Sequence, residues 1–439
     1  MNLDPEMRLI ISVLCLFPLF LQAIACFMSS SHPVKVSFDN TENAFAYKTN
    51  KELSKAHFLF SSMRFNTLVK WGTRFTPWAI KAGFPIQGLI RSTIFQQFVG
   101  GETLQETAAV VNKLAQYHVQ VILDYGVEGG DDGEAGFDHA CDEFIRVIEY
   151  AATQPNIPFM SVKVTGIARF ALLEKLDHSV EQNAGSLMKR YMLALESLTT
   201  TEKEEWQRVN ARLQRICSAA AAKGVGVLID AEDSFIQDPV DVITTLMMEQ
   251  FNKEKVVVYN TFQLYRHDRL KFLHDSHEAA VQRNFILGAK LVRGAYMEKE
   301  RERAAQMNYP SPIQNDKKST DRDFNAATKY CIDHIDRIAV IVASHNDYSN
   351  LYTTQLMDEK GLPHHHPHVH LSQLFGMSDH ITFNLAKAGF SVSKYLPFGP
   401  IKDVIPYLMR RAQENSSMGG QMGRELGLIK KEMERRNKK

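Results

Sequence analysis

The sequence predicts a parallel (β/α)8 barrel, and three observations support this fold. Short apolar runs rich in β-branched residues recur eight times between residues 119 and 399. Their Val, Ile and Leu residues are largely continuous rather than alternating, as is typical of parallel strands covered by helices on both faces. The segments between them are long enough for crossover helices. Alternating strands and helices indicate an α/β fold, and eight strands favour a closed barrel over an open sheet.

The predicted strands follow one another at fairly regular intervals. They are VQVILDYG (119–126), FMSVKVTGI (159–167), GVGVLIDAE (224–232), KVVVYNTFQ (255–263), ILGAKLVRG (286–294), IAVIVASHN (338–346), HVHLSQLFG (368–376) and SVSKYLPFG (391–399). We expect helices between them, for example over 201–224 and 322–337. An open doubly wound sheet is the alternative, but it would need a G-x-G-x-x-G turn after an early strand, and the sequence has none in that setting.

The regions outside the barrel divide the chain further. The apolar run 9–28 resembles a signal peptide, yet Asp4 and Glu6 precede it where a signal peptide carries positive charge, and Pro18 interrupts it. We therefore interpret residues 1–27 as an upstream extension, with an export signal or membrane anchor as the alternative. We expect a linker and helical arm over 28–116, the barrel over 117–417, and a basic tail, ending as a frayed helix, over 418–439.

Composition excludes some classes of function. A formal net charge of +1 in 439 residues provides no polyelectrolyte character for binding nucleic acid through its phosphates. None of the five cysteines has metal or redox spacing, which favours reduced thiols in a cytoplasmic protein. The histidine-rich stretch 363–370 and the acidic stretch 128–143 lack the spacing of metal sites, so we interpret both as solvated loops and predict no metal.

Polar residues gather at the predicted carboxyl ends of the strands, where (β/α)8 barrels build their active sites. They are Glu128, Lys163, Asp230, Glu232, Asn260, Gln263, Lys290, Arg293, Tyr296, Ser344, His345, Asn346, Lys394 and Tyr395. Lys163 lies within an apolar run, where an ammonium group needs a compensating partner. That partner is either Asp230 beneath the site or a bound carboxylate or flavin.

The segment IKDVIPYLMRRAQENS contains an RRxxE sequence. Arg410 and Glu414 are four residues apart and share a helix face, so we expect the carboxylate to orient Arg410. Two adjacent guanidinium groups suit a planar carboxylate, which one of them can bind through two hydrogen bonds. Alone, this motif is more often a solvated helix face than a site.

Four ordered motifs supply the missing context. KLVRGAY (290–296), ASHN (343–346), YLPFGP (395–400) and YLMRRAQENS (407–416) resemble the proline dehydrogenase family, most closely its eukaryotic-like branch, over about residues 118–417. The resemblance implies a (β/α)8 barrel holding non-covalent FAD. It also implies oxidation of L-proline to Δ1-pyrroline-5-carboxylate, the first step of proline catabolism towards glutamate, with electrons passed to a quinone or another acceptor.

The resemblance assigns roles to particular residues. It implies that Arg410, Arg411 and Lys163 hold the proline carboxylate, oriented by Glu414, and that Glu128 closes the pocket by pairing with Arg410. It implies that Asp230, Tyr296 and Tyr395 wall the pyrrolidine ring. Around the flavin it implies Asn260, Lys290, Arg293, Gly294, Ala295, Ser344 and His345, with Lys290 nearest the reactive edge. Bacterial members often have Gln where Asn260 stands and Arg where Lys290 stands.

Two other functions stay open. A hydroxyproline dehydrogenase is the nearest, although the residue matching Tyr395 in that branch is a serine. A flavin-free barrel that binds an anion without turnover is the more distant one. We expect a cytoplasmic protein in peripheral contact with the inner membrane, with export or lipid anchoring through residues 1–27 as the alternative.

Overall fold

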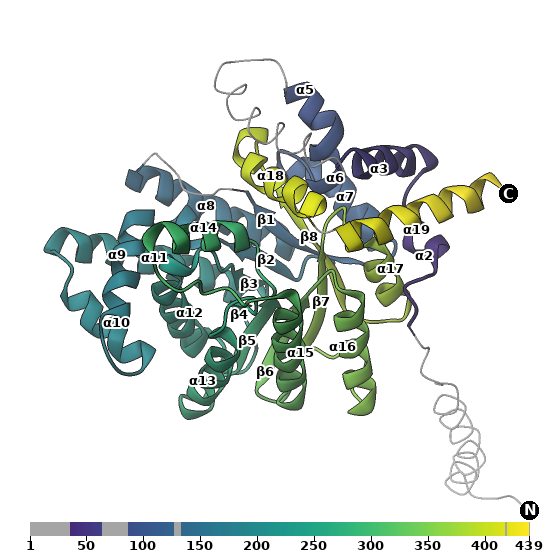
Figure 1. Ribbon diagram of the computed structural model, residues 1–439. Helices are drawn as coiled ribbons and strands as arrows, with labels where there is room; N and C mark the ends of the chain where they lie inside the picture. The colour runs from purple at the N-terminus through teal and green to yellow at the C-terminus, as the bar shows by residue number, and fades with distance from the viewer. Residues whose placement is uncertain (1–35, 64–86, 127–132, 418, 439) are drawn as a thin grey trace, which may run out of the picture. The chain divides into compact units, whose positions relative to one another are not determined.

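Eight parallel strands pair in chain order and close into a barrel, as Figure 1 shows. The computed structural model describes residues 36–63, 87–126, 133–417 and 419–438. The strands are β1 (Gln120–Tyr125), β2 (Phe159–Val162), β3 (Gly226–Ile229), β4 (Val258–Gln263), β5 (Leu287–Val292), β6 (Ile338–Ala343), β7 (Val369–Leu374) and β8 (Val392–Phe398). β8 closes the barrel against β1, from Gln120 opposite Ser393 to Tyr125 opposite Phe398. Each strand lies within a predicted run, so the predicted fold class is confirmed.

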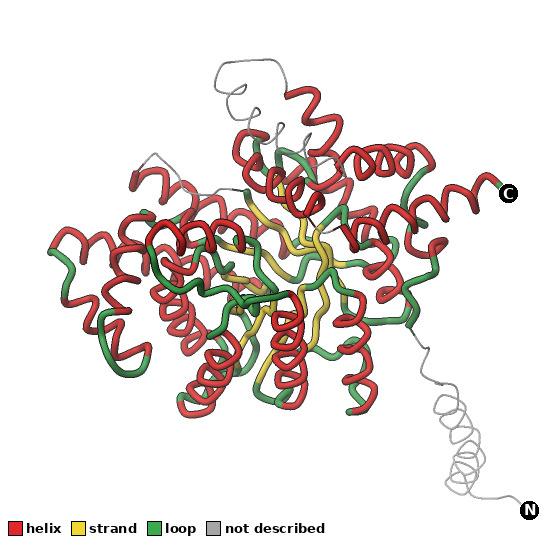
Figure 2. Tube along the Cα trace, viewed as in Figure 1, coloured by secondary structure: helices red, strands yellow, loops and turns green. Residues whose placement is uncertain are grey.

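Helices surround the strands, which form the yellow centre of Figure 2. They are α8 (Gly133–Ala152), η2 (Val164–Gly166), α9 (Phe170–Glu181), α10 (Leu187–Glu196), α11 (Thr200–Lys223), η3 (Ser234–Ile236), α12 (Gln237–Phe251), α13 (Arg269–Gln282), α14 (Met297–Met307), α15 (Lys317–Asp333), α16 (Asp347–Glu359), α17 (Asp379–Lys387) and α18 (Ile401–Ser417). The start of α11 is fixed by a capping box, in which Thr199 and Glu202 satisfy each other's backbone N–H groups. Its end is fixed by Gly224, whose φ of 69° suits a residue without a Cβ.

Burial on both faces explains the continuous apolar runs. All six residues of β4 and all seven of β8 are buried, because one side chain in two faces the barrel interior and the next faces a helix. In the interior, Ile122, Tyr259 and Ile341 belong to one apolar cluster, which also includes Tyr395. This layer fills the barrel beneath its carboxyl rim.

A second apolar cluster joins the segments on either side of the barrel sequence. Before β1 lie α2 (Thr41–Ala44), α3 (Asn50–Met63), α5 (Gln87–Ile90), the π-helical turn η1 (Arg91–Phe95), α6 (Gln96–Phe98) and α7 (Leu104–Ala115). After α18 lies α19 (Gly419–Asn437). Phe60 and Phe98 from the first group pack in the same cluster as Leu408, Leu428 and Ile429 from α18 and α19.

Two expectations about secondary structure, one for the last segment of the chain and one for the segment after β1, are wrong. Residues 419–437 form a helix with buried Leu428, Ile429 and Glu432, and not a frayed tail. Residues 133–143 belong to α8 and not to a solvated loop. The proposed extension over 1–27 lies outside the described residues, and no described helix has both the length and the hydropathy needed to cross a bilayer.

Candidate active site at the carboxyl rim of the barrel

A buried network of charged and polar side chains lies at the carboxyl ends of β1, β2, β3, β5 and β8. Lys163 Nζ donates to Asp124 Oδ1 at 2.8 Å and lies 3.6 Å from Asp230 Oδ2. On its other side, Asp230 accepts from Lys290 Nζ at 2.5 Å and from the Tyr395 hydroxyl at 2.7 Å. Each of these five residues is less than a tenth exposed. The alternative partner considered for Lys163, Asp230, is therefore present, but Asp124 lies closer.

Electrostatic interactions keep Asp230 ionised and Tyr395 protonated. Burial raises the pKa of Asp230, but the ammonium groups of Lys290 and Lys163 outweigh burial and hold that pKa below its usual value. Burial also raises the pKa of Tyr395 well above its usual value, and Asp124 and Asp230 add to this rise. Tyr395 therefore stays protonated and donates. Two ammonium groups offset two carboxylates, so the network has no net charge.

The RRxxE helix is α18, and it brings excess positive charge to the rim. The Arg410 guanidinium lies over the ring of Tyr296, 5.4 Å from its centroid. Arg411 is buried and pairs with Glu414 at 2.9 Å, an i,i+3 contact. Spacing assigned Glu414 to Arg410, and the contact of Glu414 with Arg411 was not expected. Helix α18 thus brings two guanidinium groups to the rim, beside the buried network.

Register places some predicted residues on the outer face of the barrel wall. Asn260 Nδ2 donates to Asp241 of α12 at 2.9 Å, so this amide faces the helices. Lys394 is fully buried and pairs with Asp379 of α17 at 2.9 Å, so it is not a rim residue. By the alternation of a strand, Gln263 shares the inner face of β4 with Tyr259.

Other predicted residues lie between the rim and the helices. Arg293 donates to Asp321 at 2.8 Å, to Ser344 Oγ at 2.7 Å and to Ser349 Oγ at 2.9 Å. His345 Nδ1 lies 2.9 Å from the Ser378 hydroxyl. Burial lowers the pKa of His345 well below its usual value, and Lys394 and other nearby cations add to this effect, so the ring is neutral at pH 7.

Two further residues complete the predicted stretch after β5. Gly294 has a φ of 136°, and a Cβ there would collide with the Tyr265 ring. Gly294 and Ala295 are exposed. Glu128 lies outside the described residues.

Comparison with known proteins identifies the family. The sequence pattern described as proline dehydrogenase matches residues 107–424. The chain belongs to the proline dehydrogenase family. The predicted resemblance and the expectation of an oxidoreductase are thereby confirmed.

Individual relatives of the proline dehydrogenase family have different names. The chain is 35% identical to the carbapenem antibiotics biosynthesis protein CarD of Pectobacterium carotovorum, covering 80% of this chain and 86% of CarD. It is 32% identical to proline dehydrogenase 1, mitochondrial, of Dictyostelium discoideum, covering 80% of this chain and 66% of that protein. It is 31% identical to the hydroxyproline dehydrogenase of Xenopus laevis, covering 89% of this chain and 88% of that enzyme.

A solved structure supports the fold. The chain resembles proline utilization A from Bdellovibrio bacteriovorus with a TM-score of 0.63 and 19% identity. The match covers 90% of this chain but only 41% of that longer protein. At this identity the likeness supports the barrel of the proline dehydrogenase family and not a particular substrate.

Sequence reasoning missed two members of the rim network. Ser161 Oγ donates to Asp124 Oδ1 at 2.9 Å and lies 2.9 Å from the Tyr395 hydroxyl. Asp124 could have been found from the sequence, because burying a carboxylate near the end of an apolar strand is as unfavourable as burying the ammonium group of Lys163 and equally requires a partner. Ser161 has no such signal, because serine is common in buried strands.

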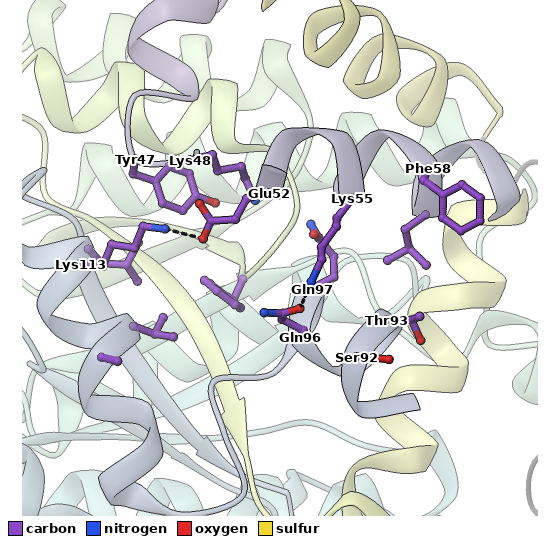
Figure 3. Close-up of a pocket in the computed structure, with 15 residues that line it drawn as sticks. Tyr47, Lys48, Glu52, Lys55, Phe58, Ser92, Thr93, Gln96, Gln97 and Lys113 are labelled. Carbon is purple, nitrogen blue, oxygen red and sulfur yellow. Dashed lines mark hydrogen bonds and ion pairs between the residues drawn. The ribbon is translucent and has the colours of Figure 1, made fainter. Parts of the chain in front are cut away.

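A separate cavity of about 320 Å³ lies between the helical arm and the loop after β7. Figure 3 shows it between α3 and the segment from η1 to α6, with Lys113 paired to Glu52 at 2.7 Å on one side and Lys55 bonded to Gln96 at 2.9 Å. Phe375 contributes to the lining. None of the rim residues named above lines this cavity, so we do not assign the chemistry to it.

Proposed function

We propose that the rim binds FAD and oxidises L-proline to Δ1-pyrroline-5-carboxylate. One observation supports this most directly, namely the two adjacent guanidinium groups of α18 beside a buried network in which two lysines face two aspartates. A zwitterionic amino acid can place its carboxylate against these guanidinium groups.

The substrate carboxylate would be held by α18. Arg411 is fixed by Glu414, and Arg410 is supported by the ring of Tyr296, so both guanidinium groups are oriented before substrate binds. Lys163 would add a third cationic donor, because its buried ammonium group lies at the rim beside Asp124 and Asp230.

The pyrrolidine ring would lie against Tyr395 and Tyr296. The Tyr395 hydroxyl is fixed by Asp230 and Ser161, so its ring has a defined orientation. Positioning of this kind brings the substrate carbon next to the ring nitrogen into a reactive geometry. These residues orient the substrate and do not attack it.

The residues present fit a flavin. Gln263 Oε1 is buried with no hydrogen-bond partner in the described structure, and the imide N–H of an isoalloxazine ring is a donor of the kind it lacks. We therefore propose Gln263, in place of Asn260, as the flavin contact on β4. Lys290, Arg293, Gly294, Ala295, Ser344 and His345 would hold the rest of the cofactor.

FAD supplies the hydride acceptor when bound, and the protein supplies position and electrostatics. The substrate amine must also lose its proton. Asp230 is a poor base, because its pKa is held low and Lys290 and Tyr395 already donate to it. We propose that solvent takes this proton before or during binding.

The visible spectrum of the purified protein tests this function. We expect flavin absorbance that bleaches when L-proline is added without an electron acceptor. A colourless preparation that also fails to bind added FAD would favour the flavin-free anion-binding barrel. Flavin that does not bleach with proline would contradict the substrate assignment.

Hydroxyproline is the competing substrate, because one relative is a hydroxyproline dehydrogenase. The aromatic ring of Tyr395 occupies the position where the resemblance expects serine in that branch. We therefore expect kcat/KM for L-proline to exceed that for 4-hydroxyproline. An equal or reversed preference would contradict this choice.

We propose a quinone as the electron acceptor, reached by a protein that binds the inner membrane peripherally from the cytoplasm. A soluble ubiquinone analogue should reoxidise the bleached flavin. Reoxidation by oxygen alone, at the same rate with and without the analogue, would count against it.

A further inference from the structure

Ser378, at the start of α17, has an unusual conformation. Its φ is 52°, in the left-handed region that non-glycine residues other than Asn and Asp seldom adopt. Serine at a helix N-cap usually accepts a hydrogen bond from the first turn, but the Ser378 side chain makes no capping bond. Its hydroxyl lies instead 2.9 Å from His345 Nδ1. The left-handed backbone of Ser378 and its missing capping bond are both unfavourable locally, so contacts from other parts of the fold must stabilise this conformation.

Those contacts come from three other elements. Gln97 of α6 donates to the carbonyl of Gly376 at 2.7 Å, and Lys394 of β8 donates to the carbonyl of Met377 at 2.5 Å. The contact on Ser378 itself is from α19, where Glu425 Oε2 accepts the Ser378 N–H at 2.8 Å. The loop between β7 and α17 is thus held through its backbone on both sides.

The carboxyl group of Glu425, which accepts the Ser378 N–H, is buried at an energetic cost. It is only 6% exposed. Burial raises the pKa of its carboxyl, an effect that His380 opposes and Asp379 reinforces. It also lies one residue beyond the range 107–424 that matches the family. A carboxylate kept in such surroundings contributes more to the arrangement of its neighbours than to overall stability.

We propose that Glu425 is a positioning residue for the flavin site, acting on His345 through Ser378. Glu425 holds the Ser378 backbone, and the Ser378 hydroxyl then holds Nδ1 of the neutral His345 ring. The Ser378 hydroxyl can donate to Nδ1 or accept from it, so this series of contacts fixes the orientation of the His345 ring whichever nitrogen carries the proton. This inference rests on the proposed contact between His345 and FAD.

A double-mutant cycle on FAD affinity tests the proposal. We expect Glu425→Ala to weaken FAD binding about tenfold, which corresponds to the loss of one buried hydrogen bond. Glu425→Gln should retain near-normal affinity, because its amide oxygen can still accept the Ser378 N–H. In a His345→Ala background, Glu425→Ala should change affinity less than about twofold. Ser378→Ala should behave like Glu425→Ala in both backgrounds.

A control separates positioning from simple helix docking. Glu432 is also a buried carboxylate of α19, but it pairs with Arg435 and Arg436. We expect Glu432→Ala to lower the melting temperature and to leave the flavin absorption spectrum unchanged, whereas Glu425→Ala shifts that spectrum. Ser378→Ala keeps the backbone contact with Glu425, so it provides the same test if Glu425→Ala does not fold.

The outcomes are distinguishable from a failure of the proposed function. Equal losses of FAD affinity with and without His345 would overturn the role of Glu425, while proline oxidation by the wild type would leave the proposed function intact. A wild-type protein that binds no FAD would overturn both.

Discussion

The Lys163 ammonium is shared by two carboxylates inside the barrel, 2.8 Å from Asp124 and 3.6 Å from Asp230. Burying one ammonium without a partner is very unfavourable, so the strand ends must supply acids wherever they supply lysines. This requirement explains why Asp124, which sequence reasoning missed, accompanies Lys163. It also makes the stability of the rim sensitive to single substitutions.

We expect Asp124→Ala to lower the free energy of unfolding by about 3 kcal/mol, because it leaves Lys163 short of a partner in a buried site. Urea unfolding measures this. Adding Lys163→Met should recover part of the loss, since the buried ammonium group that lost its nearer carboxylate is then gone. The exposed pair Lys271 and Asp275 is the control, and Asp275→Ala should change stability by less than about 0.5 kcal/mol. Equal losses at the two aspartates would contradict the argument.

We expect Arg410→Met and Arg411→Met each to raise KM for proline by about 100-fold, because each removes charge-assisted hydrogen bonds to the carboxylate. Steady-state kinetics at saturating acceptor measures the change. Arg215, which is half exposed and pairs with Asp142 away from the rim, is the control, and Arg215→Met should leave KM unchanged. An unchanged KM in both α18 variants would refute the carboxylate role of this helix.

At the scale of strands and helices, the elements that are buried on both faces were the ones that the sequence predicted best. The strands could be located from sequence because burial on both faces requires unbroken apolar runs. Which face a polar residue occupies was harder to predict, since an error of one residue reverses it. Asn260 and Gln263 illustrate this, because only the structure shows Asn260 bonded to Asp241 in the helix layer.

Helix α19 was harder still to predict from sequence. Its composition is charged, and its buried side chains include Glu425 and Glu432, so the usual apolar stripe is weak. Glu432 pairs locally with Arg435 and Arg436, but the partners of Glu425, namely Ser378 and His380, come from distant segments. No local pattern could have indicated them.

His370 of β7 provides a prediction about the barrel core. Its Nε2 contacts Ser393 Oγ, and its ring packs edge-on against Phe159 at 5.0 Å. Burial lowers the pKa of His370 from 6.5 to about 3. Between these values the unfolded chain binds a proton that the folded barrel does not, so this contribution to stability is present above pH 6.5 and is lost as pH falls.

We expect the titration of His370 to lower the free energy of unfolding by about 1.6 kcal/mol between pH 6.5 and pH 5. The unfolded residue is already half-protonated at pH 6.5, so the slope approaches about 1.36 kcal/mol per pH unit only below that pH. Comparing the wild type with His370→Gln by urea unfolding at both pH values isolates the effect, because glutamine does not titrate. Parallel pH dependences in the two proteins would show that His370 titrates normally in the folded state.

Across the whole of residues 37–439, segments far apart in sequence close around α17. Tyr47, which follows α2, donates to Asp379 at 2.7 Å, and the same carboxylate pairs with Lys394 of β8. Figure 1 shows α19 beside α2 and α3, and contacts between these helices agree with the view. The arm and the last helix therefore support the loop that carries Ser378.

Arg436 connects the two flanking segments directly and allows the last prediction. It donates to the carbonyls of Phe45 at 2.9 Å and Lys48 at 2.8 Å, and to Asn50 Oδ1 at 2.9 Å. We expect Arg436→Ala to lower the free energy of unfolding by about 2 kcal/mol, because the carbonyls lose a charged donor. Hydrogen exchange should accelerate first in α2, α3 and α19 and leave the barrel strands protected, since local opening follows the contacts that are lost. Lys430→Ala, at an exposed site on the same helix, should cause neither effect. Uniform acceleration across strands and flanking helices would contradict this prediction, because it would mean that the arm, α19 and the barrel unfold as one cooperative unit.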